Sequence, residues 1–65
     1  MDLKYLRTFI KEQIELYPDL KSRMVGLYEL CLQEIEDGDS ESHQVNFCIF
    51  DIKELIEEYL EENKK

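Results

Sequence analysis

The C-terminal third of the sequence carries apolar residues at an unbroken alternation of three and four positions. This spacing brings side chains to one side of an α-helix, because the helix completes a turn about every 3.6 residues. The residues of this stripe are Val45, Cys48, Ile52, Leu55 and Tyr59. Taken alone, residues 45–50 could be a strand, but a single strand would have no partner in this chain. We therefore predict a helix over residues 41–62.

Two further helices are predicted before it, and a proline separates them. Asp2 is a suitable N-cap, and apolar residues then recur at helical spacing. Pro18 ends that pattern, because proline lacks an amide hydrogen and disfavours helical geometry in the residue before it. The same residue suits the first turn of a new helix. The sequence therefore predicts helices over residues 2–17 and 18–37.

The turn after the second predicted helix determines how the second and third helices oppose each other. Gly38 is the expected left-handed C-cap, and Ser40 is the expected N-cap of the third helix. A hairpin folded about residues 39 and 40 opposes residues whose numbers sum to 79. The opposed pairs are Ile35 with Gln44, Cys31 with Cys48, Leu27 with Ile52, Met24 with Leu55, and Leu20 with Tyr59. Four of these five pairs join core positions on both helices, which favours an antiparallel hairpin.

The predicted fold is all-α, a small three-helix bundle in which a shorter N-terminal helix lies across the antiparallel hairpin of the second and third helices. We expect one domain over residues 1–65, because a chain of this length supports only one core. The predicted core consists of Leu6, Ile10, Ile14, Leu20, Met24, Leu27, Cys31, Ile35, Val45, Cys48, Ile52, Leu55 and Tyr59.

Charge is distributed unevenly along the sequence. The net charge is −8; residues 1–23 carry five basic and four acidic side chains, whereas residues 24–63 carry one basic and 12 acidic side chains. Such a field repels nucleic acid phosphates and anionic lipid head groups, so we expect no direct binding to nucleic acid or to a membrane. Basic partners would be drawn to the C-terminal two thirds.

The sequence also predicts a cytoplasmic protein. It begins with an amphipathic pattern instead of a signal peptide, and no apolar run approaches the ~20 residues that a membrane helix needs. Cys31 and Cys48 each lie on an apolar helix face, so we expect them to be buried and reduced. A disulfide would require their Cα atoms to approach within about 7 Å, closer than helix packing usually allows.

Motifs for metal binding and catalysis are not found. The acidic turn at residues 37–41 does not match a calcium loop, because Ser42 and Cys48 stand where that loop needs glycine and glutamate. The single histidine, His43, has no serine or cysteine placed to act as a nucleophile. We therefore expect no cofactor, no metal and no catalytic residue, and a protein that is not an enzyme.

Three residues of the last predicted helix form what we call the aromatic face: His43, Phe47 and Phe50. They recur at i, i+4 and i+7 and lie opposite the apolar stripe. In one interpretation the first helix covers them with Tyr5, Phe9 and Leu16, and they belong to the core. In the other interpretation they are a contact surface for another protein or a second copy of the chain, because aromatic residues supply much of the binding energy at such surfaces.

The leading functional hypothesis from the sequence is a small acidic, non-enzymatic protein-interaction module, a regulatory or accessory factor that binds a larger protein. The aromatic face is the predicted partner-binding site. The alternative is a nucleic-acid mimic that occupies the basic groove of a DNA- or RNA-binding protein, suggested by the acidic end of the third helix. The acidic residues at that end are Glu54, Glu57, Glu58, Glu61 and Glu62.

Overall fold

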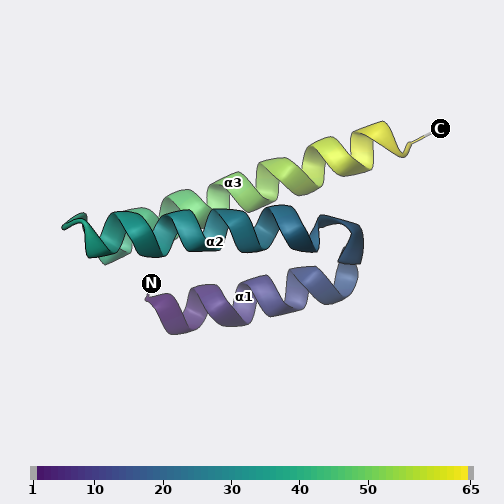
Figure 1. Cartoon of the computed structure of the whole chain (residues 1–65). Coiled ribbons are helices and arrows are strands. Elements are labelled where there is room, and N and C mark those ends of the chain that lie inside the picture. The colour runs from purple at the N-terminus through teal and green to yellow at the C-terminus, as the bar shows by residue number, and fades with distance from the viewer. Residues whose placement is uncertain (1, 65) are drawn as a thin grey trace.

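The computed structural model describes residues 2–64 and contains three α-helices joined by short connections (Figure 1). The first helix, α1, covers Leu3–Leu16, and a short 3-10 helix, η1, covers Pro18–Leu20. The second and third helices are α2 at Lys21–Glu36 and α3 at Glu41–Glu62. The all-α three-helix bundle predicted from the sequence is confirmed.

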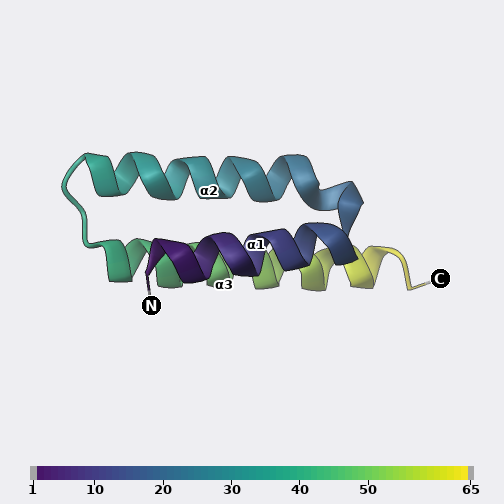
Figure 2. The same cartoon turned by 90° about the horizontal axis from the view of Figure 1, so that it is seen from below.

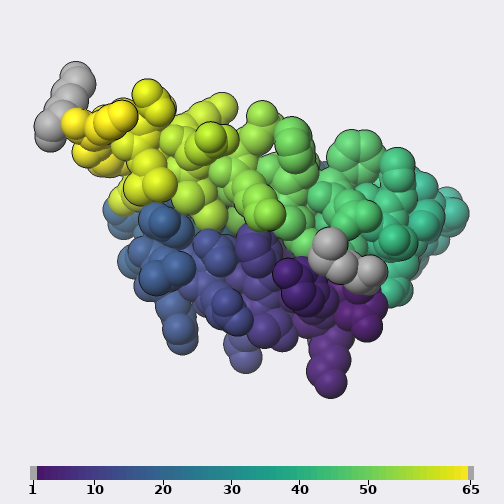
Figure 3. Space-filling view, turned by 180° about the vertical axis from the view of Figure 1, so that it is seen from behind, coloured from purple at the N-terminus to yellow at the C-terminus, as the bar shows by residue number. Residues whose placement is uncertain are grey.

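The molecule measures 43 × 18 × 17 Å, and the hairpin of α2 and α3 lies along its long axis. The two helices of the hairpin run antiparallel, and α1 lies along them in the same direction as α3 (Figures 1 and 2). α1 packs on both α2 and α3. Figure 3 shows α1 and α3 side by side, with the last turns of α3 extending beyond the N-terminal helix. In the same view, the upper side of α3 lies at the surface of the molecule.

Both predicted N-caps are confirmed by hydrogen bonds. The Asp2 carboxylate accepts a hydrogen bond from the Tyr5 amide at 2.9 Å, and the Ser40 hydroxyl accepts one from the His43 amide at 3.4 Å. Each bond satisfies an amide that the first turn of the helix leaves without a backbone partner. Gly38 ends α2 with φ of +107°, a conformation that side chains other than glycine rarely adopt. The chain can therefore reverse within four residues.

The second predicted helix, over residues 18–37, is divided into two parts. Pro18 opens η1, in which the Leu20 amide donates to the Tyr17 carbonyl at 3.0 Å. Leu20 has φ of −98° and ψ of 2°, outside the helical range, and α2 begins only at Lys21. The tighter turn of η1 allows the chain to reverse from α1 into α2. The position of Pro18 does not reveal this turn from the sequence, because proline is equally favoured in the first turn of an α-helix.

The predicted register of the hairpin is supported at two widely separated points. Nearer the turn, Cys31 on α2 and Cys48 on α3 are both buried and line the same small crevice. At the far end, the Tyr59 hydroxyl donates a hydrogen bond to the Asp19 carboxylate at 3.0 Å, and its ring meets Tyr17 edge-on at 6.1 Å. Residue numbers sum to 79 for Cys31 and Cys48 and to 78 for Asp19 and Tyr59. The register is therefore the same near the turn and at the far end, where α3 meets η1.

The core lies along the line where the three helices meet. Its buried residues are Leu6, Ile10, Leu20, Met24, Cys31, Val45, Cys48, Ile49 and Ile52. Five predicted core residues are only partly buried and pack around this centre: Ile14, Leu27, Ile35, Leu55 and Tyr59. Ile49 is buried although the sequence placed it on the flank of the helix. The reason is that α1 packs on α3 as well as on α2, so the apolar arc of α3 is wider than one stripe.

Candidate functional site

The aromatic face lies on the side of α3 that points away from the core. Phe47 and Phe50 follow the fully buried Val45 by two and five residues, and a helix turns about 100° per residue, so both rings point away from the bundle. Phe47 is 51% exposed and Phe50 is 58% exposed. His43 is also exposed. The structure therefore brings the three predicted site residues together on one solvent-facing surface.

The interpretation in which α1 covers these residues is wrong. Phe9 packs against the core, and Tyr5 and Leu16 are largely exposed. α1 instead lies against the other flank of α3, where Ile49 is buried. The apolar groups of α3 that complete the core are thus distinct from Phe47 and Phe50, and the bundle does not need these two rings to close its interior.

Contacts within the aromatic face give it a defined shape. The His43 imidazole meets the Phe47 ring edge-on, with ring centroids 4.6 Å apart and planes at 90°. This arrangement is a favoured one for aromatic pairs. His43, Asn46, Phe47 and Phe50 together line a shallow open depression of about 340 Å³. All four residues come from α3, so the depression is a surface feature of one helix.

The exposed apolar surface continues from α3 onto α2. Leu30 is 61% exposed and lines a small crevice between the two helices together with Phe47. The carboxylate residues Glu34 and Asp51 line the same crevice. Leu30 was missed in the sequence because it lies off the apolar stripe of α2. Its number and that of Phe47 sum to 77, so the hairpin register could have placed the two side by side.

Beyond Phe50, the outward side of α3 becomes acidic. Glu54 follows Phe50 by one turn, and Glu57, Glu58 and Glu61 continue on the same side. All four are exposed. The outward side of α3 therefore has an aromatic half near its N-terminus and an acidic half near its C-terminus.

The two cysteines lie in the core, as predicted, and both are free thiols. Burial raises the pKa of the Cys31 thiol above its usual value, and it raises that of Cys48 to about 12. Thiols held in this neutral state are poor nucleophiles and poor metal ligands. Within residues 2–64, no cluster of three or more potential metal-ligating side chains occurs. In the same part of the chain, no helix combines the length and the apolar character needed to cross a bilayer.

Comparisons with known proteins found no matching family model, no matching curated protein and no matching solved structure. The fold defines the class of this protein as a small three-helix bundle.

Proposed function

We propose that this protein is a non-enzymatic interaction module that binds a basic region of a larger protein through the aromatic face. The observation that carries the proposal is the exposure of Phe47 and Phe50 on the side of α3 opposite a core that is complete without them. Completely burying one phenylalanine side chain contributes roughly 1.5–3 kcal/mol. Because Phe47 and Phe50 are each more than half exposed in the isolated domain, burial of the remaining surface on binding would supply a part of this energy.

The composition of the surrounding surface supports a basic partner. Leu30 widens the apolar patch, while Glu34, Asp51 and Glu54 lie at its border. Lys53 is the one basic residue between residues 24 and 63. When the border of an apolar patch carries charge opposite to that of the partner's surface, the two proteins associate faster and wrong partners are disfavoured. A second copy of the chain would bring two acidic borders together, so we favour a different protein.

The proposal places the protein in the cytoplasm, where buried free thiols persist in reduced form. Its role would be regulatory or accessory, exerted by occupying the partner's basic surface, and it requires no chemical step. The nucleic-acid mimic remains the alternative. In that case the carboxylates of α3 would make the main contacts and the two phenylalanines would contribute little.

The test is affinity capture from an extract of the source cells, followed by affinity measurement with the purified partner. The bait proteins are the natural chain, the double variant Phe47→Ala/Phe50→Ala, and Leu16→Ala. Leu16→Ala is the control because it also truncates an exposed apolar side chain, which is 67% exposed, but on α1 and outside the aromatic face. We expect the natural chain and Leu16→Ala to retain one basic protein, and the double variant to bind it at least about tenfold more weakly, since exposed aromatic anchors dominate such interfaces.

Salt separates the two functional hypotheses. Binding through the aromatic face should persist in part at high salt, because apolar contacts are not screened. If the double variant binds as well as the natural chain, the aromatic face is not the site. Complete loss of binding at high salt, together with a captured DNA- or RNA-binding protein, would then support the nucleic-acid mimic.

A further inference from the structure

A second surface feature lies between α1 and α2 and shares no residue with the aromatic face. It is an open groove of about 540 Å³. Six residues line it: Lys4, Arg7, Thr8, Ile10, Lys11 and Tyr28. Three of these are basic and none is acidic, although acidic side chains outnumber basic ones by 16 to 8 in the whole chain. The groove is therefore a local site of positive charge on an acidic protein.

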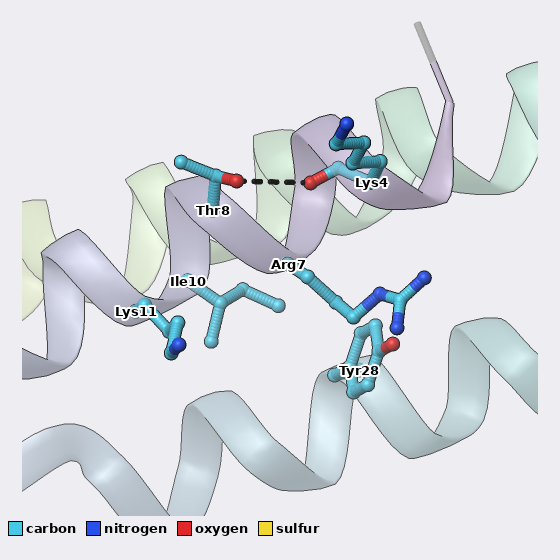
Figure 4. A pocket seen from close by; sticks show the side chains of 6 residues that line it. All are labelled: Lys4, Arg7, Thr8, Ile10, Lys11 and Tyr28. Carbon is cyan, nitrogen blue, oxygen red and sulfur yellow. Dashed lines mark hydrogen bonds between the residues drawn. The ribbon is translucent and has the colours of Figure 1, made fainter.

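The arrangement of α1 produces this concentration of charge. Lys4, Arg7 and Lys11 are spaced by three and four residues, which places them on one side of the helix. In Figure 4, the Arg7 side chain extends from α1 toward α2, where Tyr28 lines the same groove. Lys11 and Ile10 also extend toward α2. The Lys4 side chain extends to the side of α1 that points away from α2, where the Thr8 hydroxyl donates to the Lys4 carbonyl at 3.1 Å.

We propose that this groove binds a linear oligophosphate, either inorganic triphosphate or the triphosphate chain of a nucleotide. Arg7 and Lys11 both extend toward α2 and are four residues apart, which corresponds to about 6 Å along the helix. This spacing suits an extended chain of several phosphates more than a single phosphate. Arg7 can donate two parallel hydrogen bonds to phosphate oxygens. The Tyr28 hydroxyl is a further donor, and its ring and Ile10 provide an apolar wall that a nucleotide base could contact.

The size of the groove favours a small molecule over a protein segment. Its volume of about 540 Å³ falls within the usual range of small-ligand sites. A protein segment would need roughly 800 Å² of surface on each partner, far more than six residues provide. The net charge of −8 opposes anions only weakly at this place, because the Debye length is about 8 Å at physiological salt. The next charge along the same side of α1, Glu15, lies one turn beyond Lys11 and does not line the groove.

The proposal can be tested by calorimetric titration of the whole protein with inorganic triphosphate and, separately, with ATP, in buffer without divalent cations. The variants are Arg7→Gln, Lys11→Gln and the double variant. Lys53→Gln is the matched control, because it removes the same charge from an exposed position on α3. We expect saturable binding with one ligand per protein. Each groove substitution should weaken it about two- to fivefold, the double variant about tenfold, and Lys53→Gln less than twofold.

The two ligands identify the source of the phosphate chain. Equal affinity for both supports a site for the phosphate chain alone, and tighter binding of ATP supports a nucleotide site in which the base contacts Tyr28. The proposal is overturned if neither ligand saturates the protein at millimolar concentration. It is also overturned if Lys53→Gln weakens binding as much as Arg7→Gln, because binding would then reflect net charge. Circular dichroism melts of all variants check that the fold is unchanged, and the aromatic-face variants should bind both ligands normally.

Discussion

Replacing Ile52 by alanine is expected to remove most of the stability of this protein. Ile52 is fully buried in the core. Truncating such a side chain typically costs about 2–5 kcal/mol. A chain of this size has only roughly 3–10 kcal/mol in total, at about 0.05–0.15 kcal/mol per residue. The melting temperature should therefore fall by about 10 °C or more, because each kcal/mol corresponds to about 4–8 °C in a small domain.

Leu60→Ala is the matched control for this substitution. Leu60 lies on the same helix, two turns further on, but half of its surface is exposed. We expect its melting temperature to stay within a few degrees of that of the natural chain, since partly exposed side chains lose less on truncation. Equal melting temperatures for Ile52→Ala and the natural chain would mean that the three helices do not meet at Ile52, and the packing described above would be incorrect.

A second large effect is expected in the reactivity of Cys48. Burial raises the pKa of its thiol from 9.0 to about 12. At pH 8 the reactive thiolate would then be about a thousandfold scarcer than in the unfolded chain, because thiolate population falls tenfold for each unit of pKa. Alkylation by iodoacetamide should therefore be at least about a hundredfold slower in the folded protein than in concentrated guanidinium chloride. Mass spectrometry of the Cys48 peptide measures this rate.

Ser22→Cys supplies an internal reference, because position 22 is exposed on α2 and its thiol should react rapidly in the folded protein. Equal reaction rates at positions 22 and 48 would contradict the burial of Cys48.

The raised pKa of the Cys48 thiol also makes the stability of the fold depend on pH. The raised pKa means that the folded state favours the neutral thiol, so this contribution is complete below about pH 9. It is lost progressively as the pH rises from 9 toward 12, and the melting temperature should fall over that range.

The main features of the fold could be predicted because local signals agreed with one another. Asp2 and Ser40 mark helix starts, Gly38 marks the turn, and helical spacing determines which residues face inward. Once the turn is known, the register of an antiparallel hairpin follows from residue numbers alone. These signals depend on the chain within a few residues, and they require no knowledge of where α1 lies.

The features that the sequence did not predict depend on packing between helices. Ile49 is buried because α1 lies on that flank of α3, and periodicity alone could not show on which flank it packs. The same uncertainty left open whether Phe47 and Phe50 were core or surface. The basic groove was also not predicted, because Tyr28 and Arg7 line one groove only once α1 and α2 are placed side by side. Residues 18–20 form a separate 3-10 helix, which the position of Pro18 in the sequence does not distinguish from the first turn of α2.

The thermal melt of the double variant Phe47→Ala/Phe50→Ala tests most directly whether the aromatic face is a free surface. We expect its melting temperature to lie within about 3 °C of that of the natural chain, because both rings are more than half exposed and alanine favours the helix. If these rings were part of the core, each truncation would cost about 3–5 kcal/mol. The double variant would then be largely unfolded at room temperature, and the assignment of this face as a binding surface would be contradicted.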